Sequence, residues 1–283
     1  MPEGDTIFRA ATALRKALAG ARVVAMESAV LRGPYPLGER IEAVEARGKN
    51  LVLRFEKGRA LRTHMMMKGS WHLYREGEPF QRPAWQARLL LRADNGFLAV
   101  LFGAREEPAL PATGGARRRG ALIVEWLDGR EAPLMRLGPD ATSDDFDAAS
   151  ALARLRSRAD LAIGEALLDQ GALAGVGNVI KSEALFRCRA NPFAPVAALS
   201  DEQLRRLIDD CHALLIRNRT AGPRTTRDAL DGGRLWVYGR SGKPCRVCGT
   251  PIRMRRQGAA ARSSYFCPGC QQVPGAGGSP SQR

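Results

Sequence analysis

Apolar residues recur at helical spacing directly after the first five residues of the chain. The apolar positions of this run are Ile7, Ala10, Ala11, Leu14 and Leu18. Their periodicity predicts an amphipathic helix that Asp5 or Thr6 caps and that Gly20 ends. The first residues of the chain are therefore expected just before a helix N-terminus, where the helix dipole and free N–H groups favour anions such as phosphate.

A series of short apolar segments follows, several of them alternating between apolar and polar residues. The expected strands are residues 23–27, 51–55, 60–64, 88–92, 97–101 and 122–126. The sequence Asp94-Asn95-Gly96 separates two of them and is typical of a hairpin turn. Residues 105–120, rich in Pro, Gly, Ala and Arg, are expected to form a loop. The pattern predicts an antiparallel sandwich or barrel with one helix in front.

Near residue 142 the period of the apolar positions changes to that of helices. The expected helices are residues 148–158, 163–169 and 179–186, followed by one more after a Ser200-x-x-Gln203 capping box. Thr142-x-x-Asp145 is expected to cap the first of them. The turn Gly175-Val176-Gly177-Asn178 allows close approach of a ligand to the backbone and presents N–H groups to a phosphate. An ordinary helix–helix turn has the same pattern, so the motif alone leaves both interpretations open.

Four cysteines near the C-terminus have the spacing of a zinc site. Two Cys-x-x-Cys pairs are separated by 18 residues, and their members are Cys245, Cys248, Cys267 and Cys270. A site closed by four thiolates has no open position, so the expected single Zn²⁺ is structural. Another thiolate-bound metal is the alternative. The intervening residues predict a hairpin rich in arginine. Cys188 and Cys211 lie outside the pattern and are expected to be buried as small apolar residues.

Composition narrows the class of partner. The 283 residues include 44 Lys and Arg against 29 Asp and Glu, a net charge of +15. Such an excess favours a polyanion, because neutralised phosphates release counterions. No apolar run reaches the ~18–20 residues that a membrane span needs, and no signal peptide is visible. We therefore expect a cytoplasmic protein without a membrane partner, whose cysteines bind metal rather than form disulfides. The composition after Val273 predicts a disordered tail.

The N-terminus offers a nucleophile. Once Met1 is removed, Pro2 carries a secondary amine, which can attack a sugar C1′ and form a cationic iminium. An α-amino group has a pKa near ~8, so more of it is neutral near pH 7 than of a lysine side chain. Glu3 lies beside it as a candidate proton donor or acceptor. A frayed, solvated terminus is the other explanation of these residues.

Together these motifs resemble the formamidopyrimidine-DNA glycosylase/endonuclease VIII family. The resemblance rests on Pro2-Glu3-Gly4, Arg47-Gly48-Lys49, residues 168–178 and the four-cysteine finger, which occur in the family's order. Residues 2–6 and 234–240 are most similar to the second bacterial subtype of endonuclease VIII.

The implied fold is multidomain α/β, with a leading helix before an antiparallel β-sandwich. The implied domains are a catalytic β-sandwich (1–135), a helix-two-turn-helix domain (136–232), a zinc finger (233–273) and a disordered tail (274–283).

The resemblance also implies roles for single residues. Pro2 resembles the nucleophile, Glu3 the acid that helps to open the sugar, and Lys49 the lysine that assists proton transfer and holds phosphate. Asn178 and Arg262 resemble the pair that clamps the phosphates around a lesion.

The loop His64-Met65-Met66-Met67-Lys68-Gly69 resembles the family's void-filling loop. Met67 aligns best with the side chain that is inserted where a nucleotide has left the stack, and Met66 lies beside it. Core packing is the alternative, but three consecutive side chains cannot all face one core. Unbranched, polarisable Met suits a wedge between bases.

The implied function is a bifunctional DNA glycosylase and abasic-site lyase of base excision repair, with β,δ-elimination. Damaged DNA is the expected partner, and the expected enzyme is a nucleoid-associated monomer. Thr6 stands where the family usually has Glu, which leaves the proton relay around Pro2 open. The short stretch between Thr226 and Val237 favours oxidised pyrimidines as substrates. The alternatives are a DNA-binding protein that has lost catalysis and a zinc-ribbon protein of transcription or RNA.

Overall fold

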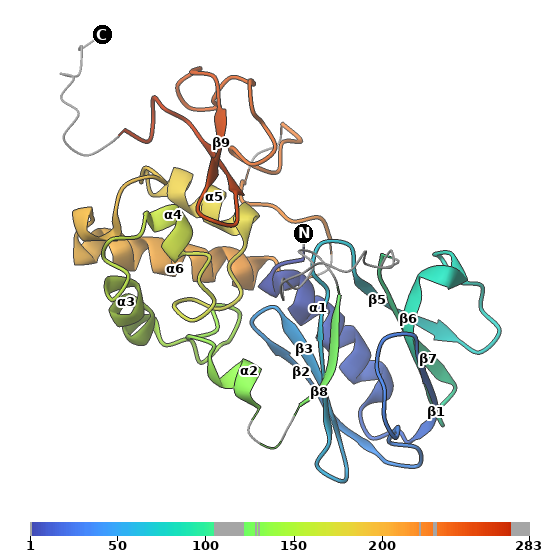
Figure 1. Ribbon diagram of the computed structural model, residues 1–283. Coiled ribbons are helices and arrows are strands. Elements are labelled where there is room, and N and C mark those ends of the chain that lie inside the picture. Colours follow the sequence, from blue (N-terminus) through green and yellow to red (C-terminus); the bar gives the residue numbers. More distant parts are fainter. Residues whose placement is uncertain are drawn as a thin grey trace, which may run out of the picture. The chain divides into compact units, whose positions relative to one another are not determined.

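The computed structural model describes residues 2–104, 122–127, 129, 131–220, 222–228 and 231–272 (Figure 1). The chain divides into two compact units, here called the N-terminal unit (1–135) and the C-terminal unit (136–283). The loop expected over residues 105–120 and the tail expected over 274–283 lie outside the described residues.

The N-terminal unit contains two four-stranded antiparallel sheets and a leading helix, α1 (Gly4–Leu18). One sheet has, in order, β1 (Val23–Ser28), β6 (Ala87–Ala93), β7 (Phe97–Phe102) and β5 (Ser70–Arg75). The other has β2 (Ile41–Arg47), β3 (Asn50–Phe55), β4 (Ala60–His64) and β8 (Ile123–Leu127). A 3-10 turn (Ala84–Gln86) precedes β6, and a short helix, α2 (Ala132–Met135), ends the unit.

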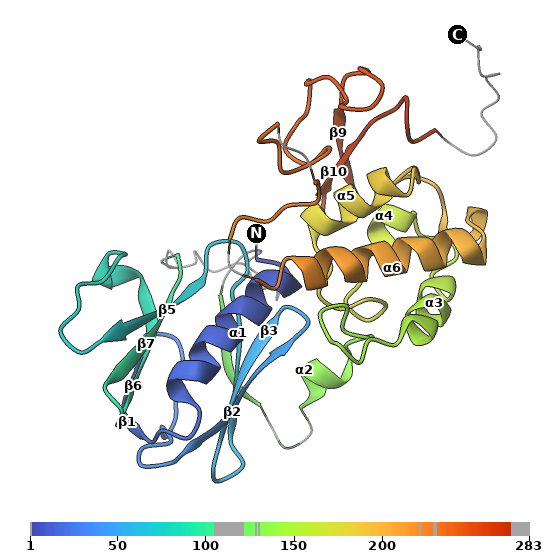
Figure 2. The same cartoon turned by 180° about the vertical axis from the view of Figure 1, so that it is seen from behind.

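Both sheets and the apolar face of α1 share one core. Leu14 of α1, Val44 of β2 and Leu89 of β6 are each buried in it. Figure 2 shows α1 lying along β2 and β3, the strands on which it packs. The predicted sandwich with a leading helix is confirmed, because alternating apolar residues of both sheets point into the same core.

Two strands, β2 and β5, were not predicted. Both lie at the edge of their sheet, where only one neighbouring strand pairs with them. β2 carries Glu42 and Glu45, and β5 carries Ser70 and His72, so polar residues interrupt the apolar run on which a strand prediction depends. Backbone pairing with a neighbouring strand determines their conformation.

The predicted cap of α1 was wrong. The helix begins at Gly4, and its N-cap Glu3 makes no side-chain capping bond. The carbonyl of Glu3 accepts the N–H groups of Thr6 (2.9 Å) and Ile7 (3.1 Å), so the first helical bonds start before Asp5. Asp5 lies inside the first turn, where its carboxylate accepts the N–H of Thr6 over 2.7 Å.

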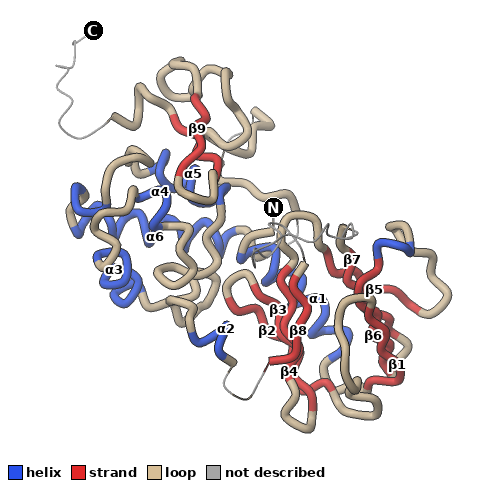
Figure 3. The backbone as a smooth tube through the Cα atoms, in the orientation of Figure 1, coloured by secondary structure: helices blue, strands red, loops and turns tan. Residues whose placement is uncertain are grey.

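The C-terminal unit combines four α-helices with a two-stranded antiparallel hairpin among its described residues (Figure 3). The helices are α3 (Ala148–Arg156), α4 (Ile163–Ala166), α5 (Asn178–Arg187) and α6 (Asp201–Arg217), with a 3-10 turn at Val196–Ala198. The hairpin strands are β9 (Arg253–Gln257) and β10 (Arg262–Phe266). The apolar faces of the helices meet in one core that includes Ile180, Leu207 and Cys211.

One of the two predicted capping boxes is confirmed and the other was wrong. Ser200 and Gln203 cap α6 reciprocally. Asp147, rather than Thr142, caps α3, and its carboxylate accepts the N–H of Ser150 over 2.9 Å. Thr142 instead donates its N–H and hydroxyl to Asp140, because a short polar side chain satisfies a local turn as readily as a helix end.

The predicted bounds of two helices were too long. α4 ends at Ala166 instead of 169, and α3 ends at Arg156 instead of 158. Asp169 takes part in a turn, where its carboxylate accepts the N–H of Gly171 over 2.8 Å. No described helix combines the length and the apolar character that crossing a membrane needs.

Candidate nucleic-acid interface and zinc centre

Pro2 and Glu3 lie immediately before the first turn of α1. Pro2 is half-buried, whereas Glu3, whose backbone is extended, and Asp5 are buried. Met1 lies outside the described residues. A helix N-terminus leaves N–H groups without partners in its first turn, so this end of α1 carries partial positive charge.

The direction of α1 brings this terminus to a defined end of the N-terminal unit. Arg15 Nε donates to the carbonyl of Val44 over 2.8 Å, and the N–H of Gly20 donates to the carbonyl of Ile41 over 2.8 Å. The helix therefore runs opposite to β2. Glu3 precedes Arg15 by about 18 Å of helix, and Lys49 follows Val44 by about 17 Å of extended chain. Glu3 and Lys49 thus lie towards the same end of the unit.

Lys49 occupies the tight turn between β2 and β3. Arg47 and Asn50 pair across this turn, and Gly48 has a φ of 58°, which a two-residue hairpin turn requires. The side chain of Asn50 donates to the carbonyl of Arg47 over 3.0 Å and accepts from Arg62 Nε over 2.8 Å. These bonds fix the turn that presents Lys49.

The third segment at this end begins with His64. Because β3 and β4 are antiparallel with Leu51 opposite Thr63, His64 ends its strand beside the residues that follow Lys49. Burial, with the charges of Lys49 and Arg62, lowers the pKa of His64 to about 4. The electrostatic effect of Lys49 is consistent with this proximity.

The methionines after His64 divide between core and solvent. Met65 is 3% exposed and belongs to the sandwich core, whereas Met67 is 57% exposed. Met66 has a φ of 48°, and the N–H of Gly69 closes the loop by donating to the carbonyl of Met65 over 2.8 Å. A Cβ at Gly69 would come within 2.5 Å of that carbonyl oxygen, so the loop requires glycine there. Core packing therefore explains Met65 but not Met67.

In the C-terminal unit, Asn178 is the first residue of α5. The side chain of Gln170 holds the preceding turn, because its Nε2 donates to the carbonyl of Val176 (3.1 Å) and its Oε1 accepts from the N–H of Gly175 (3.1 Å). Asn178 is 6% exposed, and its Oδ1 has no hydrogen-bond partner among the described residues. A half-turn of the amide exchanges oxygen and nitrogen, so the same position can offer Nδ2 to an anion at the helix N-terminus.

Arg262 is the first residue of β10 and pairs with Gln257 across the hairpin. Its side chain is exposed, as are those of Arg253, Arg255 and Arg256 on the opposite strand. The hairpin therefore presents several guanidinium groups to solvent, an arrangement that suits a polyanion.

The four predicted zinc ligands come together. Their Sγ atoms all lie within 4.8 Å of one another, and three Sγ–Sγ distances are 3.8, 3.4 and 3.4 Å. Sulfur atoms bound tetrahedrally at ~2.3 Å would lie about 3.8 Å apart, so the cysteines fit one Zn²⁺. The ion is structural, because all four positions are filled by thiolates; those ligands are Cys245, Cys248, Cys267 and Cys270.

Comparison with known proteins finds three matching family models along the chain. Residues 1–106 match the formamidopyrimidine-DNA glycosylase N-terminal domain, and residues 137–228 match the formamidopyrimidine-DNA glycosylase H2TH domain. Residues 242–273 match the zinc finger found in FPG and IleRS. The chain belongs to the formamidopyrimidine-DNA glycosylase/endonuclease VIII family. Membership places it among the DNA glycosylases and abasic-site lyases of base excision repair.

Relatives match over nearly their whole length. The chain is 37% identical to the probable endonuclease 8 2 of Streptomyces coelicolor, with 97% of this chain and 95% of that protein covered. It is 35% identical to the DNA-(apurinic or apyrimidinic site) lyase Nei2 of Mycolicibacterium smegmatis, with 96% and 99% covered. The crystal structure of the MutM (Fpg) protein from Thermus thermophilus superposes with a TM-score of 0.73 at 31% identity, with 96% and 99% covered.

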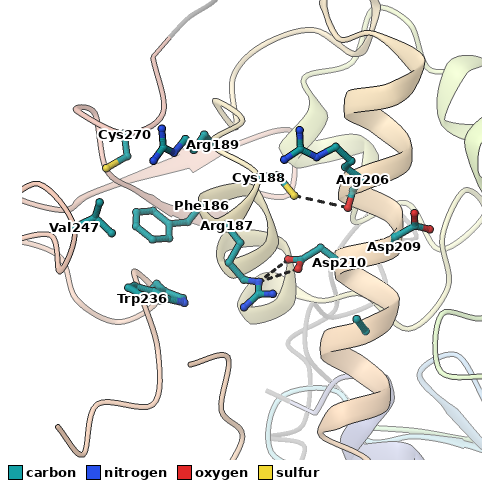
Figure 4. Close-up of a pocket in the computed structure, with 11 residues that line it drawn as sticks. Phe186, Arg187, Cys188, Arg189, Arg206, Asp209, Asp210, Trp236, Val247 and Cys270 are labelled. Carbon is teal, nitrogen blue, oxygen red and sulfur yellow. Dashed lines mark hydrogen bonds and ion pairs between the residues drawn. The ribbon is translucent and has the colours of Figure 1, made fainter. Parts of the chain in front are cut away.

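The C-terminal unit also has a pocket that none of the residues predicted to bind or react with DNA lines. It has a volume of about 650 Å³ and lies at the C-terminal end of α5, between Phe186, Trp236 and the exposed side of α6 (Figure 4). Arg187 pairs there with Asp210 over 2.8 Å. Cys270 is the only zinc ligand in its wall, and neither Asn178 nor Arg262 lines it. Pro2, Glu3 and Lys49 do not line it either.

The two remaining cysteines were both expected to be buried. The expectation is confirmed for Cys211, whereas Cys188 is only partly buried. Cys211 is fully buried, and Cys188 is partly exposed at the pocket. Burial raises the pKa of Cys188 to about 11, which leaves its thiol protonated at neutral pH.

Two buried charged residues of α5 were missed at the level of sequence. Lys181 and Glu183 are both fully buried. In the sequence they resemble ordinary solvated helix residues. Only the structure shows that the hairpin packs on Lys181 and that residues 226 and 236–238 pack on Glu183. The available signal was that the sequence of α5 lacks a clear division into an apolar and a polar face.

Proposed function

We propose that the chain removes oxidised bases from DNA and then cleaves the strand, with the amine of Pro2 as nucleophile. One observation carries the proposal: Pro2 and Glu3, the Lys49 turn and the His64–Gly69 loop lie at the same end of the N-terminal unit. A nucleophile, a carboxyl group, a cation and an exposed apolar side chain are the groups that this chemistry needs in one place.

In the proposed reaction, the neutral amine of Pro2 attacks C1′ and the bond from C1′ to the base breaks. The base leaves with its electron pair and takes up the proton that the amine of Pro2 loses, and Glu3 supplies the proton that opens the sugar ring at O4′. The resulting iminium acidifies the C2′ proton, whose loss expels the 3′ phosphate. A second elimination expels the 5′ phosphate, and water then releases Pro2. Lys49 holds phosphate and assists the proton transfers.

The proposed grip on DNA has two parts. Asn178 and Arg262 hold phosphates, one from a helix N-terminus and one from an exposed hairpin. Met67 fills the gap when the damaged nucleotide leaves the stack, a step that costs a few kcal/mol, and Met66 supports it from the same loop. The 57% exposure of Met67 supports this role.

Oxidised pyrimidines are the proposed substrates. The N–H of Thr226 donates to the carbonyl of Arg234 over 2.9 Å, and only seven residues separate the two in the sequence. The endonuclease 8 2 name of the Streptomyces relative supports the same branch. We further propose a monomer in the cytoplasm, associated with the nucleoid, with domain boundaries near residues 135, 232 and 273.

Borohydride trapping tests the mechanism. Reduction of the iminium on abasic DNA should add the mass of the DNA strand to the purified protein, whose own mass should lack Met1. Pro2→Gly and Glu3→Gln should abolish excision of thymine glycol, whereas Glu202→Gln, on the exposed first turn of α6, should not. Undiminished excision by Pro2→Gly would exclude Pro2 as the nucleophile. Tight DNA binding without any trapped adduct would favour the alternative, a DNA-binding protein without catalysis.

A further inference from the structure

Lys181 is a buried cation that the proposed chemistry does not use. It is 0% exposed, although lysine is almost never fully buried unless its ammonium group is paired. Its Nζ donates to the carbonyl of Ser263 over 2.9 Å and to the hydroxyl of Ser264 over 2.7 Å. Lys181 therefore joins α5 to the hairpin strand that begins with Arg262.

The bonds continue beyond Ser264. The Ser264 hydroxyl donates to Oε1 of Gln257 over 2.7 Å, and Nε2 of Gln257 donates to the carbonyl of Pro192 over 2.8 Å. Gln257 is the residue that pairs with Arg262 across the hairpin. Both strands of the hairpin are thus held beside Arg262 by polar groups that are buried.

Lys181 also lies three residues after Asn178 on α5, so the two residues share one side of the helix. The side chain of Arg262 is exposed, and its location depends on the backbone that carries it. Ser263 directly follows Arg262 in the chain, and its carbonyl accepts the hydrogen bond from Lys181. An apolar residue of the same size would fill this space without the cost of removing a charge from water. The ammonium group therefore contributes directed hydrogen bonds rather than packing.

We propose that Lys181 is a positioning residue that sets the spacing between Asn178 and Arg262, and hence the fit of this pair to neighbouring DNA phosphates. The proposal rests on the phosphate-binding part of the proposed function and does not depend on Pro2. A charge-assisted bond from a rigid helix fixes the strand more narrowly than apolar packing does. A small displacement of a binding group can greatly weaken its interaction with the bound molecule.

A double-mutant cycle tests the proposal. The affinity for a duplex with a tetrahydrofuran abasic analogue is measured by fluorescence anisotropy for Lys181→Met, Arg262→Ala and the double variant. Lys181→Met should weaken binding about tenfold, as expected for the loss of a hydrogen bond to a charged group. Because Lys181 acts through Arg262, the double variant should bind no more weakly than Arg262→Ala. The proposal would be overturned if the losses of affinity of the two single variants multiplied in the double variant, or if Lys181→Met bound as tightly as the parent chain.

Controls separate positioning from folding and from charge. Lys243→Met removes a charge from an exposed lysine of the finger and should leave affinity within about twofold, as surface substitutions usually do. Zinc content and melting temperature are measured for every variant. If Lys181→Met does not fold, Ser264→Ala replaces it in the cycle. Ser264→Ala should lose less affinity than Lys181→Met, and it should lose none when Arg262 is already Ala. An additive Ser264→Ala effect would also refute the proposal.

The cycle remains informative if the catalytic proposal fails. A protein that binds DNA but forms no borohydride adduct would refute the role of Pro2 and leave the coupling of Lys181 and Arg262 measurable. In an active enzyme, Lys181→Met should raise KM and leave the trapping rate at saturating DNA unchanged. A lower trapping rate at saturation with unchanged affinity would place Lys181 in the chemistry and contradict positioning.

Discussion

Nδ1 of His64 accepts the backbone N–H of Met66 over 3.0 Å. This bond holds Met66 in the left-handed region, with a φ of 48°, between buried Met65 and exposed Met67. Nδ1 can accept only when it carries no proton. Burial and the charges of Lys49 and Arg62 lower the pKa of His64 to about 4, so the ring is neutral at pH 7. The conformation of the loop therefore depends on an unprotonated His64.

Acid should weaken the fold through His64. Its pKa is about 4 in the folded chain and near 6.5 in the unfolded chain, so between these values the unfolded chain binds a proton that the folded chain does not. The stabilisation is fully present above pH 6.5 and is lost as the pH falls towards 4, by at most about 3.4 kcal/mol. Urea unfolding at pH 7 and pH 5 measures this loss.

The matched variant is His64→Gln, whose side-chain oxygen can accept the same N–H without titrating. It should lose less stability between pH 7 and pH 5 than the parent chain. His72→Gln is the control, because burial lowers the pKa of His72 as well but leaves the Met66 bond intact. Equal losses for the parent chain and His64→Gln would show that His64 does not couple pH to the fold.

Met67→Ala should slow base excision but not strand cleavage at an existing abasic site. A flipped base leaves a gap that an exposed Met67 can fill, whereas an abasic site costs less to extrude. We expect about a tenfold loss of excision under single-turnover conditions, from about 1–2 kcal/mol of lost stacking. Met135→Ala is the control, because Met135 is 78% exposed on α2. Equal losses on both substrates would remove the wedge from the mechanism.

The features that the sequence could predict are those written in short-range patterns. The Asp94-Asn95-Gly96 turn, the Ser200-x-x-Gln203 cap and the spacing of the zinc ligands each depend on a few neighbouring residues, and each is present. Edge strands β2 and β5 escaped prediction because their partners, rather than their own residues, impose the extended conformation.

The roles of His64 and Lys181 could not be predicted because both depend on register. His64 lies beside the Lys49 turn only when β3 and β4 pair with Leu51 opposite Thr63. Lys181 meets Ser263 only when the hairpin packs on α5. Nothing in the residues next to either one specifies that partner.

Zinc removal should disorder the hairpin that carries Arg262. Below about 40 residues a unit rarely folds without a staple, and the finger's core is small, with Val237 and Ile252 beside the ligands. Cys248→Ser should lower the zinc content below about one ion per chain and weaken DNA binding. Cys188→Ser, outside the ligand set, is the matched control. Full DNA affinity in a zinc-free Cys248→Ser protein would contradict the structural role.

Glu183→Gln should destabilise the attachment of the finger to α5. The carboxylate is fully buried and accepts the N–H groups of Trp236 (2.7 Å), Val237 (2.9 Å) and Tyr238 (2.8 Å), together with the hydroxyl of Thr226. Glutamine replaces one of its oxygens by an NH₂ group, which would face donors and leave at least one of them unpaired. An unsatisfied buried donor and a lost charge-assisted bond together cost about 2–4 kcal/mol.

The loss should appear as a lower urea midpoint and as faster hydrogen exchange of residues 236–238. Exchange in β3 and β4, which belong to the N-terminal unit, should be unchanged. Glu202→Gln, at an exposed position of α6, should change the free energy of unfolding by no more than about 0.5 kcal/mol. If Glu183→Gln unfolds like Glu202→Gln, with unchanged exchange at residues 236–238, then water can replace the carboxylate as the acceptor and Glu183 does not fasten the finger.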